Sequence, residues 1–151
     1  MRLIRLAAVG TGVALAVGLS GTPASAASAT NRFENQAEHL KCLDYRADWG
    51  VYVTGCNSGA YQKWTWNNTS GRATALRQVA TRACLTVRGG KVAMKPCASA
   101  DRAALWKVVR SSAGAQIKNN ANGTCLGRMA NDHVNVARCT GGTSQRWKIL
   151  P

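Results

Sequence analysis

Few residues of this sequence could perform acid–base chemistry. The 151 residues contain six carboxylates and two histidines: Glu34, Glu38, Asp44, Asp48, Asp101, Asp132, His39 and His133. Asp44 and Asp48 are close enough to flank one turn, but nothing around them marks the pair as the acid and base of a hydrolase. No Ser-His-Asp or Cys-His arrangement is indicated, because the two histidines are isolated in the sequence. We therefore expect a protein that is not an enzyme and that has no cofactor.

Six cysteines offer a second kind of chemistry. A zinc site would require closely spaced ligands, but the sequence has no C-x-x-C pair and only two histidines, so no metal site is predicted. An even number of cysteines in a short exported chain instead indicates a set of disulfides.

The start of the chain indicates export. In residues 1–26, Arg2 and Arg5 precede an apolar run from Leu6 to Leu19, and the segment ends in the small residues Ala-Ser-Ala at 24–26. This is the pattern of a secretory signal peptide cleaved after residue 26, and the run is too short and too glycine-rich for a transmembrane helix. No later run could form a transmembrane segment. We expect a secreted, extracellular protein, whose surroundings allow disulfides to form.

The cysteines fall in pairs that repeat along the chain. Within a pair they are 14, 13 and 14 positions apart: Cys42 and Cys56, Cys84 and Cys97, Cys125 and Cys139. A leucine follows the first cysteine of each pair, and a tryptophan lies 22 positions after it, at Trp64, Trp106 and Trp147. The recurrence of all these relations three times predicts three copies of one structural unit.

Each copy has the pattern of short strands separated by turns. In the first copy, CLDY, VYVTGC and QKWTW are short runs with alternating or β-branched character, bounded by Gly, Asn and Asp. This predicts an all-β protein, with no helix after residue 26 except one turn near residues 34–41. Three units of about forty residues fit a threefold barrel better than a three-bladed propeller. We expect the three tryptophans in its core rather than stacked on a sugar.

These motifs resemble the ricin-type β-trefoil lectin family. The resemblance rests on Cys42-Leu43-Asp44 with Gln62-Lys63-Trp64, and on Cys125-Leu126 with Gln145-Arg146-Trp147. The middle copy keeps Cys84-Leu85 and Trp106 but has Ala104 in the glutamine position.

The resemblance covers residues 38–151 and implies a β-trefoil, a six-stranded barrel capped by three hairpins. The implied repeats are about 38–80, 81–121 and 122–151, each with an internal disulfide: Cys42–Cys56, Cys84–Cys97 and Cys125–Cys139. Residues 27–37 are then expected to form a lead-in before the domain, one that can be flexible.

The family binds galactose- or xylose-type sugars in a shallow pocket on each repeat. In its pattern an aspartate accepts hydrogen bonds from two sugar hydroxyls, an aromatic ring stacks on the sugar, and an asparagine and a glutamine complete the site. In the first repeat the asparagine position holds Tyr61 and the aromatic position holds Thr54. The predicted carbohydrate site consists of the matching residues and the nearby aromatics: Asp44, Gln62, Tyr61, Trp49 and Tyr52.

The other two repeats have lost most of this pattern. Thr86 and Gly127 stand in the aspartate position, so Asp44 is the one family aspartate that the chain retains. An alternative stays open for Asp44, which could cap its own turn or pair with Lys41 or Arg46.

The chain is strongly basic, with a formal net charge of +14. Without residues 1–26 there are 18 basic and 6 acidic residues, a net charge of +12. Such a charge favours anionic polymers as partners, although strand alternation would scatter neighbouring charges over two faces. No motif for a specific nucleic acid is present. The second repeat carries most of the charge: Arg82, Arg88, Lys91, Lys95, Arg102, Lys107, Arg110 and Lys118.

Together these patterns predict a secreted, monomeric, non-catalytic module that binds a sugar or polysaccharide, with its best site in the first repeat. Two alternatives remain: a β-trefoil that binds or inhibits another protein, and a basic module that binds anionic polymers of a cell surface.

Overall fold

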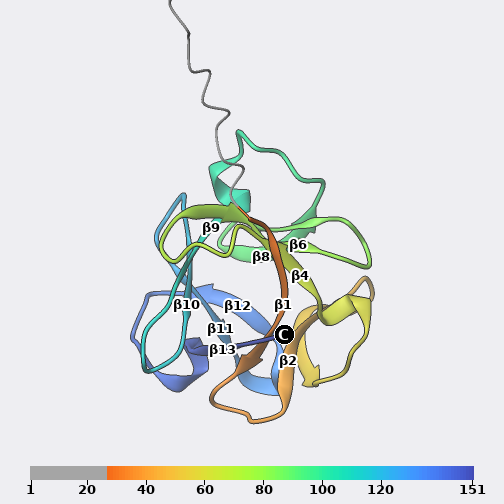
Figure 1. The fold of residues 1–151 in the computed structure, drawn as a ribbon, viewed down its shortest axis with the longest axis vertical. Helices are drawn as coiled ribbons and strands as arrows, with labels where there is room; N and C mark the ends of the chain where they lie inside the picture. The colour runs from red at the N-terminus through yellow and green to blue at the C-terminus, as the bar shows by residue number, and fades with distance from the viewer. Residues whose placement is uncertain (1–26) are drawn as a thin grey trace, which may run out of the picture.

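The computed structural model describes residues 27–151, so the predicted signal peptide lies outside the described residues. These residues form thirteen short strands and four single-turn 3₁₀ helices (Figure 1). The strands are β1 Ala29–Asn35, β2 Lys41–Arg46, β3 Gly50–Gly55, β4 Trp64–Trp66, β5 Ala73–Ala75, β6 Arg77–Gln78, β7 Cys84–Arg88, β8 Lys91–Lys95, β9 Leu105–Val109, β10 Gln116–Asn119, β11 Cys125–Arg128, β12 Val134–Ala137 and β13 Trp147–Leu150. The 3₁₀ helices are η1 Ala60–Gln62, η2 Arg102–Ala104, η3 Ala130–Asp132 and η4 Thr143–Gln145. No helix of residues 27–151 is long and apolar enough to cross a membrane.

The strands form three hairpins and one barrel. The hairpins β2–β3, β7–β8 and β11–β12 are antiparallel pairs in which the first strand carries the first cysteine of its repeat. The other strands pair in a ring, β13–β1–β4–β6 and β5–β9–β10, and a bridge between Ala115 and Trp147 closes it. Because β5 and β6 are two parts of one barrel strand, separated at Leu76, the ring has the six strands of the predicted β-trefoil.

The leucine and tryptophan of each repeat lie together in the core. All six side chains are fully buried, and each indole Nε1 donates a hydrogen bond to the carbonyl oxygen of the leucine in its own repeat. The three bonds are Trp64 to Leu43 at 3.1 Å, Trp106 to Leu85 at 2.8 Å and Trp147 to Leu126 at 3.0 Å. A buried indole N–H needs such a partner. In each repeat this hydrogen bond joins the hairpin strand that carries the leucine to the barrel strand that carries the tryptophan. The prediction that the tryptophans are core residues is confirmed.

Each repeat also contains one disulfide, as the family resemblance implied. The bridges join Cys42 to Cys56, Cys84 to Cys97 and Cys125 to Cys139, with Cα–Cα distances of 4.9, 5.0 and 5.0 Å. By the loop-closure estimate each contributes about 3 kcal/mol to stability.

The predicted lead-in is corrected by the structure. Residues 29–35 form β1, which pairs with both β4 and β13, and Phe33 is fully buried in the core. The domain therefore begins at the start of β1 rather than at residue 38. The polar sequence ATNRFEN conceals this strand, because Phe33 is its only large apolar residue.

A buried amide beside each repeat supports the segment that leads to its tryptophan. Asn35, Gln78 and Asn119 donate through their side-chain nitrogens to the carbonyl oxygens of Ser144, Tyr61 and Ala103, at 2.8, 2.6 and 2.9 Å. The acceptor lies each time three residues before a core tryptophan. These amides hold the short segments η4, η1 and η2 against the barrel.

Candidate functional site

A pocket of about 490 Å³ lies on the first repeat. It is formed by the hairpin β2–β3, by the turn between these strands, and by the segment that follows Cys56. Its lining residues are Asp44, Arg46, Ala47, Asp48, Tyr52, Asn57, Gly59 and Tyr61. Three of the five predicted site residues, Asp44, Tyr52 and Tyr61, therefore share one pocket.

Asp44 is a buried carboxylate in the wall of this pocket. Its side chain is on β2 opposite Tyr52 of β3, and the residue is only 5% exposed. Its Oδ1 accepts a hydrogen bond of 2.6 Å from the Tyr45 backbone N–H. Burial raises the pKa of the Asp44 carboxyl, while the Gln62 amide, the Tyr45 N–H and the charge of Arg46 act in the opposite direction. The burial that raises this pKa is created by the fold.

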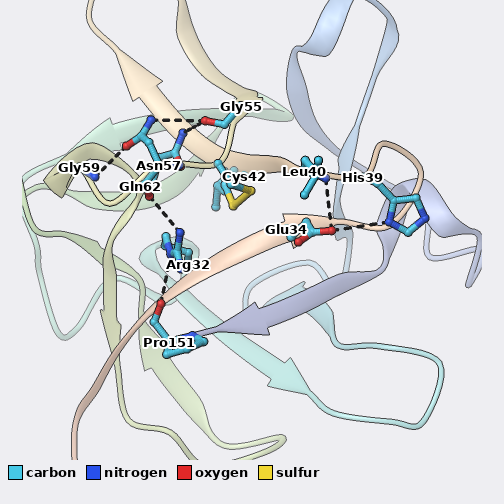
Figure 2. Close-up of a disulfide and its surroundings, with 12 residues drawn as sticks. Arg32, Glu34, His39, Leu40, Cys42, Gly55, Asn57, Gly59, Gln62 and Pro151 are labelled. Carbon is cyan, nitrogen blue, oxygen red and sulfur yellow. Dashed lines mark hydrogen bonds and ion pairs between the residues drawn. A yellow bond between two sulfur atoms is a disulfide. The ribbon is translucent and has the colours of Figure 1, made fainter.

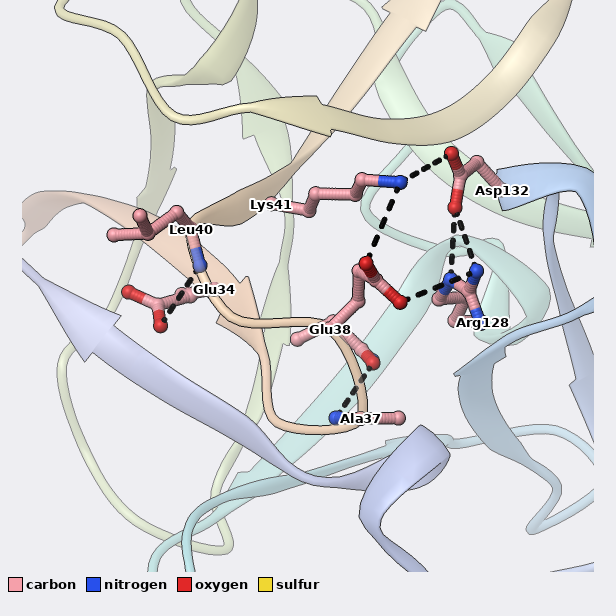
Figure 3. Close-up of polar contacts among 8 residues, drawn as sticks. Glu34, Ala37, Glu38, Leu40, Lys41, Arg128 and Asp132 are labelled. Carbon is pink, nitrogen blue, oxygen red and sulfur yellow. Dashed lines mark hydrogen bonds and ion pairs between the residues drawn. The ribbon is translucent and has the colours of Figure 1, made fainter.

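Neither of the two cations proposed as ion-pair partners forms a salt bridge with Asp44. Lys41 instead lies 2.6 Å from Asp132 and 3.8 Å from Glu38, and Arg128 completes this cluster (Figure 3). Arg46 donates two hydrogen bonds to Asp48, of 3.1 and 2.7 Å, at the rim of the pocket. The carboxylate in the pocket wall is therefore separate from the ion pairs of the surface.

Gln62 is fully buried and holds the chain around Cys56. Its Oε1 accepts from the backbone N–H of Asn57 at 2.8 Å, and its Nε2 donates to the carbonyl of Gly55 at 2.9 Å (Figure 2). We call this pair of bonds the glutamine clamp. Gln62 is not among the pocket-lining residues, so it supports the pocket wall through Asn57.

The third repeat contains the same clamp. Gln145 accepts from the N–H of Thr140 at 2.8 Å and donates to the carbonyl of Arg138 at 2.9 Å, on either side of Cys139. Because the clamp recurs where no family aspartate is present, the glutamine has a structural role.

Asn57 is a pocket residue that the sequence analysis missed. Its Oδ1 accepts from the N–H of Gly59 at 2.7 Å, and its Nδ2 lies 3.3 Å from the carbonyl of Gly55. These bonds fix the turn after Cys56 and place an amide in the pocket, although Tyr61 occupies the family's asparagine position. The available signal was the sequence Asn-Ser-Gly directly after a cysteine, which is typical of such a turn.

Trp49 lies outside the Asp44 pocket. Its ring stacks on Tyr52, with centroids 5.9 Å apart and planes at 12°, and its Nε1 donates to Nε2 of His133 at 2.9 Å. It lines a separate hollow of about 380 Å³ that also includes Lys91 and His133. Trp49 therefore positions Tyr52, and joins the first repeat to the third.

The equivalent positions of the other repeats are closed. Thr86 is fully buried, and its Oγ1 accepts a hydrogen bond of 2.8 Å from Arg88, which also pairs with Asp101. At Gly127, a Cβ would lie 2.9 Å from Cγ of Gln145 and 3.2 Å from the carbonyl oxygen of Ser144. The third repeat therefore has no space for a side chain at the aspartate position. Among residues 27–151, no three His, Cys, Asp or Glu side chains are grouped so as to hold a metal ion.

The sequence of residues 29–148 matches the family model of the ricin-type β-trefoil lectin domain. The chain belongs to this family. The match begins at the first residue of β1, in agreement with the corrected start of the domain. Domains of this family are typically non-catalytic and bind carbohydrate.

Solved structures with the same fold include a designed protein and natural ones. The designed threefold-symmetric protein ThreeFoil is 16% identical with a TM-score of 0.70, over 81% of this chain and 98% of its own. An endo-β-galactosidase from Clostridium perfringens that releases GlcNAcα1-4Gal is 13% identical with a TM-score of 0.71, over 81% of this chain and 32% of its own. A Polyporus squamosus lectin, bound to the epitope Neu5Acα2-6Galβ1-4GlcNAc, is 12% identical with a TM-score of 0.66, over 80% of this chain and 48% of its own. At these identities the likeness shows the β-trefoil fold alone. No curated protein matches the chain in sequence.

Proposed function

We propose that this protein is secreted and binds a galactose- or xylose-type sugar in the first-repeat pocket, through Asp44. The observation that supports this most directly is an aspartate residue, only 5% exposed, in the wall of a pocket that also contains two tyrosines. An ionisable group held in a desolvated position, with a shifted pKa, is typical of a functional site.

The chemistry of the lining suits a neutral sugar ring. An ionised Asp44 accepts hydrogen bonds from two adjacent hydroxyls, and the Asn57 amide offers both a donor and an acceptor. Tyr52 and Tyr61 offer apolar ring faces to the C–H groups of the sugar, and Tyr61 is 54% exposed and available for contact. The proposed site therefore consists of Asp44, Asn57, Tyr52 and Tyr61, with Gln62 and Trp49 as supporting residues.

The proposal is tested by glycan-array screening and calorimetry of the wild type and Asp44→Asn. Asparagine keeps the size of the side chain but loses the charge, so we expect the affinity for the retained sugar to fall about tenfold or more. Asp132→Asn, which removes a carboxylate outside the pocket, serves as the matched control and should bind normally. An array without any retained glycan at low and at high salt, or an unchanged affinity of Asp44→Asn, would reject the proposal.

Sugar binding should also depend on pH through Asp44. The protonated carboxyl loses acceptor capacity, and burial raises the pKa of Asp44, so affinity should decline on acidification at a higher pH than for a solvent-exposed aspartate. Calorimetry across the acidic range measures this midpoint. Asp44→Asn should show weak binding that no longer follows this titration.

A further inference from the structure

A second and larger pocket, of about 750 Å³, lies between the first two repeats. Tyr45 and Ala47 contribute from the first hairpin, and residues of β6, of the turn before β7, of β8 and of the segment directly after β8 complete it. Three cations, Arg77, Arg82 and Lys95, line this hollow, and no carboxylate does so. We call it the basic pocket. It is distinct from the Asp44 pocket, although Ala47 borders both.

The charge of the basic pocket is not neutralised by the protein. The ion pairs found in residues 27–151 include none of its three cations. Glu38, Asp48, Asp101 and Asp132 pair with Lys41, Arg46, Arg88 and Arg128, Glu34 lies beside His39, and Asp44 forms no salt bridge within these residues. All six carboxylates of the chain lie in this part of the sequence. A hollow with three uncompensated cations attracts an anionic ligand.

One turn places the two arginines together. Nε of Arg77 donates to the carbonyl oxygen of Arg82 at 3.0 Å, which fixes the guanidinium of Arg77 beside the turn between β6 and β7. The turn itself is closed by the bonds from Gln78 N to Ala83 O and from Arg82 N to Gln78 O, each of 2.9 Å. The guanidinium of Arg77 and the backbone of Arg82 are therefore held in place at the edge of the basic pocket.

Arg82 occupies a backbone position that favours glycine. Its φ is +61°, in the left-handed region, and the position two residues before the first cysteine is also left-handed in the other repeats, at Leu40 (+63°) and Gly123 (+71°). A side chain with a Cβ is strained in this region, whereas glycine is not. The strain makes it possible to remove the Arg82 side chain without weakening the fold.

We propose that the basic pocket binds the acidic group of an anionic saccharide, such as a uronic acid chain. Arg77 and Arg82 would hold carboxylate groups through their guanidinium N–H donors, and Lys95 would add a third positive charge. Tyr45, Met94 and Pro96 provide apolar surface within the same hollow, which suits the C–H face of a sugar ring. An acidic saccharide needs both cations for its carboxylates and apolar surface for its rings. The basic pocket offers both, whereas a flat cationic surface would offer only the cations.

The test is calorimetric titration with a galacturonic acid oligosaccharide and with a neutral galactose oligosaccharide of the same length. Arg82→Gly should lower the affinity for the acidic oligosaccharide about tenfold, and its melting temperature should equal or exceed that of the wild type. Arg77→Gln should give a similar loss of affinity. Leu40→Gly makes the same backbone change in the first repeat without a change of charge, and it should bind normally.

A further control separates the pocket from the general charge of the surface. Lys107→Gln removes an exposed cation of the same repeat that does not line the basic pocket, and it should leave the affinity nearly unchanged. An equal loss in Lys107→Gln, equal affinity of Asp44→Asn for the neutral and the acidic oligosaccharide, or tighter binding of a single-stranded oligonucleotide would each overturn the proposal. Asp44→Asn should retain binding of the acidic oligosaccharide, so failure here is distinguishable from failure of the Asp44 site.

Discussion

The first and third repeats share their supporting contacts but differ in the residue that could bind a ligand. Both contain a tryptophan bonded to its leucine carbonyl, and both contain a glutamine clamp around the second cysteine. At the aspartate position the first repeat has Asp44 in a pocket wall, whereas the third has Gly127 packed against Gln145. The residues that stabilise the repeat are therefore separate from the aspartate that could bind a ligand. The aspartate can be lost while the stabilising residues remain.

The second repeat shows that even part of the scaffold is replaceable. Ala104 removes the clamp, and Asp101 instead caps η2 by accepting from the N–H of Ala103 at 3.0 Å while pairing with Arg88. The core bond from Trp106 to Leu85 is retained. The indole bond is thus common to all three repeats, and the clamp and the carboxylate are not.

The largest expected effect comes from giving the third repeat the missing aspartate. Gly127→Asp should lower the free energy of unfolding by at least about 3 kcal/mol, because the new side chain collides with Gln145 and Ser144 and buries a charge. Denaturant unfolding measures this change. Asp44→Gly makes the opposite exchange and should cost only about 1 kcal/mol. If Gly127→Asp were as stable as the wild type and gained sugar affinity, the conclusion that the third repeat has no space for an aspartate would be wrong.

The next effect tests whether the two clamps are equivalent. Gln62→Ala and Gln145→Ala should each reduce stability by about 1–3 kcal/mol, because each leaves a backbone N–H and a carbonyl oxygen without their partner. Sugar affinity should fall for Gln62→Ala and stay constant for Gln145→Ala. Equal losses of affinity in both variants would mean that the glutamines act through the whole fold and not through the pocket.

A smaller effect concerns the left-handed position before the first cysteine. Leu40→Gly should stabilise the protein by about 1 kcal/mol, since Leu40 is 73% exposed and its φ of +63° favours glycine. Gly123→Ala should destabilise the third repeat by a similar amount, because a Cβ there meets no neighbour and only the backbone is strained. Thermal unfolding of both variants measures these changes in stability. Melting temperatures that shift in the same direction for both variants would contradict the prediction.

The smallest effect involves the ion-pair cluster between the first and third repeats (Figure 3). Asp132→Asn should cost about 0.5 kcal/mol at neutral pH, as is usual for ion pairs at a protein surface. The hydrogen bond from Lys41 lowers the pKa of Asp132, so the stabilisation is present above the unfolded pKa and is lost as the pH falls through the folded one. Unfolding measured from neutral to acidic pH should therefore show the variant and the wild type converging. A difference in stability that stayed constant at all pH values would show that it does not come from the charge of Asp132.

Much of the fold could be predicted because it depends on spacing. The cysteine pairs, the leucine after each first cysteine and the tryptophan 22 positions later identify the repeat, and a unit too small to bury its own apolar face must close with the other two. Strand β1 could not be predicted in this way, since it carries no cysteine and has a single large apolar residue, Phe33. The strand pairs with β13, at the far end of the chain, and that pairing is not visible in the local sequence.

The candidate site, like the fold, could be predicted from the sequence only in part. The sequence by itself determined that Asp44 is the one remaining family aspartate, that the tryptophans belong to the core, and that six cysteines form a repeated set. Only the tertiary structure decided that Asn57 enters the pocket, that Trp49 turns away toward His133, that Gly127 leaves no space, and that Arg77, Arg82 and Lys95 line one hollow. The physical reason is that a repeat pattern shows only the contacts that recur at a regular spacing in every unit. A pocket instead depends on side chains that one unit alone has, as around Asp44, or that approach one another from two units, as in the basic pocket.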